Sequence, residues 1–528
     1  MIKGKSLRSI KDNMVYSGCA FFLRESKEYT PVNCVFENCS FRTSVIFKSI
    51  ENSTFTNCNF SDNVTLRSIC KDFEKFSFIQ TLDLHDTKIK KLPKQIVQLS
   101  SLCTLNLAGT SIRKLPSEIG QLSSLQNLNL AGTNIRKLPS EIGQLSLLKN
   151  LNLASTNIRK LPSEIGQLSL LKNLNLGRTG VIELPNEIGL LSSLQDLNLK
   201  YTRITHLPKE IEKLSSLQNL NLYFSTLLEL PNEIGKLSSL QNLNLEGTRV
   251  LELPSEIGQL SSLQNLNLEE TYITYLPKEI GKLTSLRNLN LYLVPLRELP
   301  KEIGLLIAIE VLDLSFAQLS ELPREIGKLT SLRELSVGSE LLQEKLLIPK
   351  EIAQLSSLEE LYIQNANIEE LLTEKWLFMS LHTLGLSIME ILELPEQVCE
   401  LTCLCHLDLC ATKIKKLPSE IKQLSQLQTL NLFRTHITKF PKEIIHLSSL
   451  QYLNLADTKI RTIPREIEKL TLLEKLNLSG TKIEKLPEEI SKLQSLQEIY
   501  FVNTKIKIPP QELDNLPLLR VRGSWKAQ

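Results

Sequence analysis

A unit of 23 residues repeats from Ile79 almost to the C-terminus of this 528-residue chain, and this repeat constrains the fold more than any other feature. Three consecutive copies share the consensus sequence LxxLNLAxTxIRKLPSEIGQLSx and begin at Leu102, Leu125 and Leu148. There are 19 full copies, interrupted by a three-residue insertion near Gln343–Leu346 and followed by a half copy at Leu519–Gly523. A unit this short cannot bury its own apolar face, so the copies are predicted to stack into a solenoid.

The copy Leu125–Leu147 shows what each unit is predicted to form. Leu128 and Leu130 alternate with polar residues, which predicts a short strand whose leucines point inward. Pro139 suits the first position of a helical turn, and Glu141 suits the positive N-terminal end of that turn. Each copy is therefore predicted to be a coil of strand, loop, short helix and loop. Stacked coils place their strands side by side, which gives an α/β fold class with one parallel sheet.

This repeat resembles the leucine-rich repeat family over most of the chain. The resemblance implies a curved right-handed solenoid, with a parallel sheet on the concave face, short helices or turns on the convex face, and a usual role in protein binding. The LPxEIxxLxxLxxLxL wording is similar to Ras-group and disease-resistance-like repeats. The family usually has asparagine three places after the second strand leucine, bonding the neighbouring coil, whereas this chain mostly has threonine, as at Thr133. We expect the buried threonine hydroxyl to bond a nearby backbone carbonyl.

Residues 1–78 are not leucine-rich, and they are predicted to cap the first coil, because the end of a solenoid needs a cover. Part of this segment resembles the pentapeptide-repeat family, which implies a β-helix with pairs of inward residues. Here the large residues are Phe36, Phe41, Ile46, Phe55 and Phe60, and the small ones are Cys34, Cys39, Ser44, Ser53 and Cys58. Residues 67–76 are expected to add a short capping helix.

The repeat domain is assigned to residues 79–518, and residues 519–528 form the half repeat and the C-terminal end. Because only this half repeat and Trp525 cover the last coil, the C-terminal end is a candidate for self-association.

Composition narrows the classes of partner and the compartment. The net charge is +3, so no bulk basic field favours nucleic acid. No apolar run approaches the roughly 18 residues that cross a membrane, and the stretch Cys19–Leu23 is too short for a secretory signal. The ten cysteines show no paired framework, which favours a reducing, cytoplasmic location. Export by a route that needs no signal sequence is the alternative.

The densest cluster of potential metal ligands is Cys399, Cys403, Cys405, His406 and Cys410. The repeat places Cys405 and Cys410 at opposite ends of a strand segment, roughly 16 Å apart when extended. Zinc ligands must all lie within about 2.3 Å of the metal, so we predict no metal site. Phosphate loops, serine-hydrolase motifs and zinc-protease motifs are absent from the sequence. We therefore expect no catalytic residue and no cofactor. An enzyme in the N-terminal segment, built on Cys19 or Cys70, is the least supported alternative.

Two rows of asparagine are predicted on the outward side of the strands. The central row includes Asn106, Asn129, Asn152, Asn175, Asn198 and Asn221, and the flanking row includes Asn127, Asn150, Asn173, Asp196, Asn219 and Asn242. We interpret both rows as ladders that stabilise the sheet. A polar surface for an extended peptide backbone is the alternative.

The row that follows the second strand leucine becomes aromatic near the middle of the array. Exposed aromatic residues on a concave face are typical of binding hot spots. The candidate partner-binding residues are Tyr201, Tyr223, Phe224, Glu246, Glu269, Tyr292, Leu293 and Phe316. Copies from Leu286 to Cys403 are the most irregular, since Val294, Ala317, Ala366 and Met389 replace the threonine.

The residue just before each Leu-Pro pair forms blocks of charge along one lateral edge. The blocks are Lys91, Lys114, Lys137 and Lys160, then mostly Glu183, Glu229, Glu252, Glu298, Glu321 and Glu393, then Lys416, Lys439 and Lys485. A solvated edge is one interpretation, and contact with a charge-complementary partner or a second copy is the other.

Together these observations predict a non-catalytic scaffold that binds a protein partner on the concave face, without nucleic acid, membrane, metal or cofactor. The resemblance to Ras-group repeats implies one alternative, a regulator of a signalling enzyme such as a small GTPase or phosphatase. An exported effector acting on host proteins is another.

Overall fold

The computed structural model describes residues 1–25, 27–43, 45–48, 50, 53–56, 58–60, 64–66, 76–339, 345–506, 513, 516 and 519–522. Several predicted features lie outside these residues, namely Ser44, the side chain of Phe60, Cys70 within the capping helix, Gln343 in the insertion, and Trp525. The chain divides into two compact units, Met1–Leu263 and Gln264–Gln528.

The repeat coils of the first unit each consist of one short strand and one five-residue 3₁₀ helix, as the sequence predicts except for the type of helix. The strands are β12 (Thr81–Asp83), β13 (Thr104–Asn106), β14 (Asn127–Asn129), β15 (Asn150–Asn152), β16 (Asn173–Asn175), β17 (Asp196–Asn198), β18 (Asn219–Asn221) and β19 (Asn242–Asn244). The 3₁₀ helices are η2 (Lys94–Gln98), η3 (Ser117–Gln121), η4 (Ser140–Gln144), η5 (Ser163–Gln167), η6 (Asn186–Leu190), η7 (Lys209–Lys213), η8 (Asn232–Lys236) and η9 (Ser255–Gln259).

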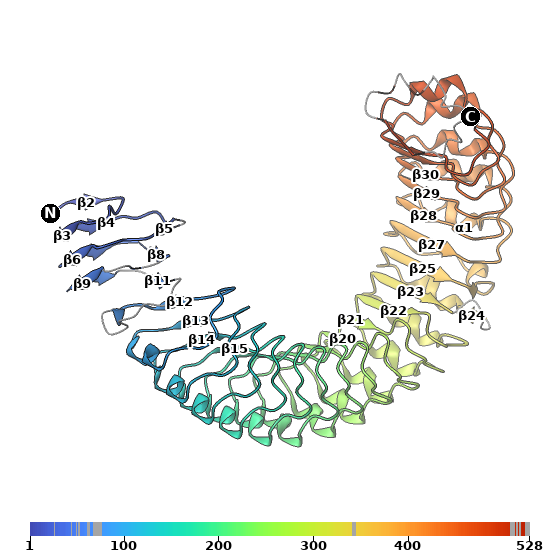
Figure 1. The fold of residues 1–528 in the computed structure, drawn as a ribbon. Helices are drawn as coiled ribbons and strands as arrows, with labels where there is room; N and C mark the ends of the chain where they lie inside the picture. Colours follow the sequence, from blue (N-terminus) through green and yellow to red (C-terminus); the bar gives the residue numbers. More distant parts are fainter. Residues whose placement is uncertain are drawn as a thin grey trace. The chain divides into compact units, whose positions relative to one another are not determined.

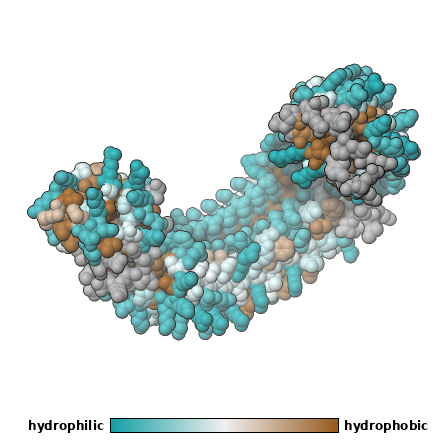
Figure 2. Space-filling model, turned by 45° about the horizontal axis from the view of Figure 1, so that its top comes forward, coloured by the Kyte–Doolittle hydropathy of each residue, from teal (hydrophilic) through white to brown (hydrophobic). Residues whose placement is uncertain are grey.

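Register between coils follows the repeat without slippage. In β14 and β15, Leu128 pairs with Leu151, one repeat further along the chain, and the strands run parallel. The strands of the unit lie along the inner side of its coils and the 3₁₀ helices along the outer side (Figure 1). These paired leucines are buried, since at most 1% of the surface of Leu128 and of Leu151 is exposed. Hydrophilic residues cover most of the visible surface of the coils (Figure 2), so the leucines account for the core.

The predicted proline position is shifted by one residue. Pro139 precedes η4 as its N-terminal cap and has an extended backbone, with φ −69° and ψ 151°. The coils approach each other closely on this side. A Cβ added at Gly143 would lie only 2.6 Å from the Glu164 carbonyl oxygen of the next coil. The close approach does not set the type of helix, because η2 and η7 have Val97 and Glu212 at the same coil position and are also five-residue 3₁₀ helices.

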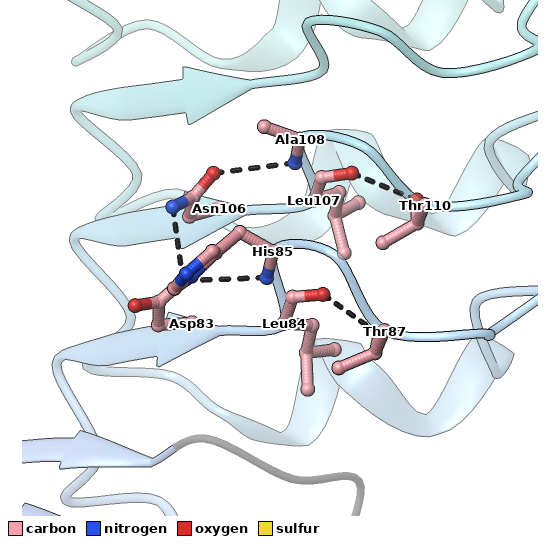
Figure 3. Close-up of polar contacts among 8 residues, drawn as sticks. All are labelled: Asp83, Leu84, His85, Thr87, Asn106, Leu107, Ala108 and Thr110. Atoms are coloured by element: carbon pink, nitrogen blue, oxygen red, sulfur yellow. Dashed lines mark hydrogen bonds and ion pairs between the residues drawn. The ribbon is translucent and has the colours of Figure 1, made fainter.

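Threonine closes the loop after the strand in most coils, as predicted from its position. The Thr110 hydroxyl donates to the Leu107 carbonyl at 2.7 Å, and Thr87 donates to Leu84 at the same distance (Figure 3). All the threonines at this position make the same bond, at Thr133, Thr156, Thr179, Thr202, Thr248, Thr271, Thr412, Thr435, Thr458 and Thr481. Each bond stays inside its own coil, so these hydroxyls do not replace the cross-coil bonds of the asparagine that the family usually has there.

The N-terminal segment is also built from stacked parallel strands. One sheet has the order β1 (Ile2–Lys3), β3 (Val15–Ser17), β6 (Val35–Glu37), β9 (Thr54–Thr56), and a second has the order β2 (Ser6–Leu7), β4 (Ala20–Phe21), β7 (Ser40–Phe41), β10 (Asn59–Phe60). Further strands are β5 (Glu28–Tyr29), β8 (Val45–Phe47) and β11 (Val64–Leu66).

The interior of this segment holds most of the predicted inward residues. Phe36 and Phe41 are buried, and Phe36 stacks on Phe55 with 4.6 Å between ring centroids. The prediction for Ile46 is wrong, because the chain buries its neighbours Val45 and Phe47 instead. The five-residue spacing therefore ends before Ile46. Strand β11 pairs in parallel with both β8 and β12, so the segment continues the sheet of the repeats.

The second unit repeats the same coil. Its strands are β20 (Asn265–Asn267), β21 (Asn288–Asn290), β22 (Val311–Ser315), β23 (Glu334–Gly338), β24 (Leu346–Leu347), β25 (Glu360–Gln364), β26 (Ala366–Asn367), β27 (Thr383–Ser387), β28 (His406–Asp408), β29 (Thr429–Asn431), β30 (Tyr452–Asn454), β31 (Lys475–Asn477), β32 (Glu498–Tyr500) and β33 (Arg520–Arg522). Its helices are η10 (Lys278–Lys282), η11 (Lys301–Leu305), η12 (Arg324–Lys328), η13 (Lys350–Gln354), η14 (Leu371–Thr373), α1 (Glu396–Cys399), η15 (Ser419–Gln423), η16 (Lys442–His446), η17 (Arg465–Lys469) and η18 (Glu488–Lys492).

The irregular copies differ in their strands. β22, β23, β25 and β27 have five residues rather than three, and β24 and β26 form an additional parallel pair. Ala317, Ala366 and Met389, which stand in place of the threonine, are buried. The missing hydroxyl alone does not lengthen a strand, because Val294 also lacks one and β21 before it keeps three residues. At the C-terminal end, the half repeat supplies β33, which pairs with β32.

Candidate partner-binding surface

A single residue with a left-handed backbone follows the strand in nearly every coil. In the first unit this position has φ between 49° and 67° at Asp86, Gly109, Gly132, Ser155, Arg178, Tyr201, Phe224 and Gly247. Glycine adopts this conformation freely, whereas other L-residues pay roughly 1–2 kcal/mol for it. Two adjacent coils nevertheless place an aromatic residue here, at Tyr201 and Phe224. Because Asp86, Ser155 and Arg178 share this backbone, the strain belongs to the repeat, and the two rings are what set these coils apart.

Three of the predicted residues form one aromatic cluster in the first unit. The ring of Tyr223 meets that of Phe224 edge to face, with 4.8 Å between centroids, and that of Tyr201 likewise at 5.1 Å. Tyr201 and Phe224 stack on each other at 5.8 Å with 25° between their planes. Their side chains remain 38% and 40% exposed. We call Tyr201, Tyr223 and Phe224 the aromatic cluster.

Two neighbours fix the edges of the aromatic cluster. The guanidinium carbon of Arg178 lies over the Tyr201 ring, 4.6 Å from its centroid, which is the geometry of a cation–π contact. On the other side, the Phe224 ring lies against Gly247, where an added Cβ would come within 2.8 Å of ring carbons. Backbone bonds between coils hold the positions, since the Tyr201 N–H donates to the Tyr223 carbonyl at 2.7 Å. Sequence reasoning missed Arg178, although counting 23 residues back from Tyr201 places it at the same coil position.

The central asparagine row has a role beside the predicted ladder, of which one bond between coils is the Asn106 side-chain amide donating to Asp83 at 2.9 Å (Figure 3). The side-chain oxygen of Asn106 accepts the backbone N–H of Ala108, two residues along, at 3.2 Å (Figure 3). Asn221 does the same for Tyr223 at 3.0 Å. These bonds hold the chain as it leaves the strand, immediately before the left-handed residue. Asparagine in this row therefore positions the side chains of the candidate site.

The flanking row does form the predicted ladder. The Asn150 side-chain amide donates to the side-chain oxygen of Asn127, and Asn173 donates to Asn150 in turn. Further along the unit, Asn219 donates to Asp196 and Asn242 donates to Asn219. The amides of this row are thus bonded to one another across coils, which supports the sheet.

The remaining predicted site residues divide between the two units. Glu246 belongs to the first unit and is half-buried, and its carbonyl accepts the Phe224 N–H at 2.7 Å. In the second unit, Tyr292 and Phe316 meet edge to face at 5.5 Å. Leu293 shares the left-handed conformation of Phe316, with φ 56° and 59°.

Glu269, also in the second unit, accepts a hydrogen bond from the Asn290 side-chain amide at 2.9 Å. The structure therefore brings the predicted residues together as two separate groups, one in each unit.

The irregular coils of the second unit present carboxylates where the asparagine ladder would continue. Glu334 in β23 pairs directly with Glu360 in β25. Burial raises the pKa of Glu334, and the charges of Glu360 and Asp313 raise it further. The Tyr362 hydroxyl donates to Glu360 at 2.9 Å, and burial together with this bond raises the pKa of Tyr362 to about 12.

The cysteine cluster is dispersed. Cys399 is buried in α1, while Cys403 is exposed. The Cys405 thiol donates to the Cys403 carbonyl at 3.5 Å. Burial and the nearby Glu420 and Glu396 raise the pKa of Cys399 to about 11. Among the residues that the structure describes, His, Cys, Asp and Glu side chains do not gather in threes around a point that could hold a metal ion.

Comparison with protein families gives matches along almost the whole repeat region. The family described as leucine-rich repeat region matches residues 119–174, 140–228, 164–246, 220–295, 278–377, 370–454 and 441–527. The family described as leucine rich repeat matches residues 77–135. Among curated proteins, none matches the chain.

Solved structures show the same fold. A leucine-rich repeat protein of Leptospira interrogans is 32% identical, with a TM-score of 0.55, and the match covers 87% of this chain and 99% of that one. The plant peptide hormone receptor RGFR1, in complex with RGF2, is 22% identical with a TM-score of 0.54, covering 99% and 93%. YopM from Yersinia enterocolitica is 18% identical with a TM-score of 0.54, covering 85% and 88%. In the described part of the chain, no helix is both long enough and apolar enough to pass through a membrane.

Proposed function

Because this chain belongs to the leucine-rich repeat family, we propose that it is a non-catalytic scaffold that binds a protein partner on the strand face of its coils. The family and the fold generally serve as interaction modules. The aromatic cluster Tyr201, Tyr223 and Phe224 is the centre of the proposed site in the first unit. Tyr292, Leu293 and Phe316 form a second group of contacts in the second unit.

One observation carries this proposal. At the left-handed position, coils of the same unit have Gly109, Gly132 and Gly247, which adopt it without strain, and also Asp86, Ser155 and Arg178. Tyr201 and Phe224 pay the strain of roughly 1–2 kcal/mol each and leave two-fifths of their surface in water. Core packing does not require this arrangement, because the coils with glycine have the same strands and the same buried leucines. Because other non-glycine residues of the unit share the strain, it is the exposed and mutually stacked rings of Tyr201 and Phe224 that a contact with a partner accounts for.

Exposed aromatic rings held in a rigid array suit protein recognition. They bring large contact areas, and their rotamers are already fixed by the neighbouring rings, so little side-chain entropy is lost on binding. RGFR1, whose structure contains RGF2, has the same fold. At 22% identity this likeness extends to the fold alone, so it identifies neither the partner nor its binding mode.

Replacement by glycine offers a sharp test. Tyr201→Gly and Phe224→Gly remove the rings and relieve the left-handed strain, so we expect partner binding to be lost while thermal stability is kept. Ser155→Gly is the matched control, because Ser155 has φ 57° at the same coil position and lies outside the aromatic cluster.

The measurement is affinity capture from an extract of the source cells, followed by binding of the identified protein to purified variants. A captured protein that binds both glycine variants as tightly as Ser155→Gly would place its site away from the aromatic cluster. If Tyr292→Ala and Phe316→Ala alone abolish binding, the site belongs to the second unit.

A further inference from the structure

A groove runs along the lateral edge of the first unit, beside the aromatic cluster. Its volume is about 1650 Å³, and residues from Arg136 to Arg203 line it, which corresponds to four successive coils. Tyr201 and Arg178 lie at its border and belong to its lining. Its apolar surface comes from Ile182, which is 55% exposed, whereas Leu138 and Leu161 in the lining are buried. We call this cavity the edge groove.

Basic residues dominate the rim of the edge groove. Its lining includes the six cations Arg136, Lys137, Arg159, Lys160, Arg178 and Arg203, against the three carboxylates Glu164, Glu183 and Glu187. The same two coil positions are also basic in the two preceding coils. The exposed pairs are thus Lys90–Lys91, Arg113–Lys114, Arg136–Lys137 and Arg159–Lys160, one pair in each coil.

Most of the eight cations in these four pairs have no carboxylate partner in the part of the chain that the structure describes. Lys160 pairs with Glu183 at 3.0 Å. For the other seven members of the four pairs, no ion pair forms with any residue in the part of the chain that the structure describes. Seven unpaired cations in four adjacent coils repel one another, and a negatively charged partner would relieve that repulsion.

We propose that the edge groove binds an extended, acidic peptide segment of a protein partner. This inference rests on the proposed function, because it names the class of segment that the scaffold holds beside the aromatic cluster. The charge favours carboxylates, and the exposed Ile182 provides contact for an apolar side chain between them.

Nucleic acid fits the edge groove less well. Proteins that hold single strands stack bases on aromatic side chains, and the only aromatic side chain lining this groove is Tyr201, whose face already contacts Arg178. Glu164, Glu183 and Glu187 would oppose a continuous chain of phosphates but can lie beside neutral residues of a peptide.

The length of the segment follows from the coil spacing. Parallel strands lie about 4.8 Å apart, so the four coils that line the edge groove and the two basic coils before them, from Lys90 to Arg203, together extend roughly 25 Å. An extended chain advances about 3.3 Å per residue, which gives a segment of about eight residues.

The test uses the full-length protein and fluorescence anisotropy with a labelled peptide of sequence EDLEDLED. Its neutral counterpart QNLQNLQN is the ligand control. We expect Arg136→Glu with Arg159→Glu to weaken binding of EDLEDLED at least tenfold. Lys213→Glu with Lys236→Glu makes the same change of net charge at exposed residues outside the groove, and we expect less than a twofold effect. Raising the salt concentration should weaken the wild-type affinity.

Several results would overturn the inference. One is equal binding of EDLEDLED to both charge-reversed variants, and another is equal binding of EDLEDLED and QNLQNLQN to the wild type. Tighter binding of a labelled oligouridine than of EDLEDLED would assign the groove to nucleic acid. Salt-sensitive dimerisation that Arg136→Glu abolishes, without peptide binding, would assign it to a second copy. The Phe224→Gly variant separates the two proposals, because it should lose the captured partner and keep EDLEDLED.

Discussion

Replacing Gly247 by alanine tests whether the aromatic cluster depends on the packing of the Phe224 ring against Gly247. Gly247 has φ 64°, and Gly132 occupies the same coil position with φ 67°. Both alanine variants should therefore pay about 1–2 kcal/mol for a left-handed backbone. The two variants differ in the room for the added methyl group. The Cβ at position 132 would have no atom closer than 3.6 Å, whereas the Cβ at position 247 would lie 2.8 Å from the Phe224 ring.

The Phe224 ring must move in the Gly247 variant, and its contacts with Tyr223 and Tyr201 are then lost. Aromatic pairs of this kind contribute about 0.5–1.5 kcal/mol each, so we expect Gly247→Ala to cost about 1–3 kcal/mol more than Gly132→Ala. Urea unfolding of both variants measures the difference, and partner binding measures its consequence. Equal losses of stability, with binding unchanged in both, would refute the packing of Phe224 on Gly247 and its role in binding.

Two further predictions concern the sheet. Glu334→Gln should stabilise the protein at neutral pH by about 0.2–1 kcal/mol, because it removes a like-charge pair with Glu360 across adjacent strands. The raised pKa of Glu334 means that protonation favours the folded state, so this gain should disappear below the ordinary glutamate pKa, and equal gains at pH 7 and pH 3.5 in urea melts would contradict the pairing. Leu151→Asp should cost several kcal/mol, because Leu151 is 1% exposed and the carboxylate would have no partner; it should also make unfolding less cooperative, and an unchanged melt would contradict the register.

The sequence predicts the coil well because every coil has to bury the same apolar positions against its neighbours. Leucine spacing determines which residues are buried, and the 23-residue period determines the register, as the pairing of Leu128 with Leu151 confirms. The threonine hydroxyl bonds were predictable because a buried hydroxyl needs an acceptor and the Leu107 carbonyl lies three residues away. The type of helix was not predictable, since a proline before the turn and an inward-pointing Ile142 suit a single turn of either an α-helix or a 3₁₀ helix.

The site was predictable in part. An aromatic row can be read from the sequence, and it identified Tyr201, Tyr223 and Phe224. The left-handed backbone at Tyr201 and Phe224 could not be predicted from the residue types, because residues as different as Asp86 and Ser155 occupy the same coil position with the same backbone. The contact of Arg178 with Tyr201 depends on a side-chain rotamer, and the repeat pattern carries no information about it.

Left-handed strain alone does not mark a binding site in this chain. Ile388 and Ala411 occupy the same coil position with φ 57°, and they lie far along the sequence from the aromatic cluster. What distinguishes Tyr201 and Phe224 is that strain, exposure and mutual ring contact coincide in adjacent coils. An aromatic residue that served only to fill the loop would bury its ring, and a residue that arose by drift would have no reason to stack on its neighbour. The coincidence of all three therefore supports partner contact at these two residues more strongly than any one of them does.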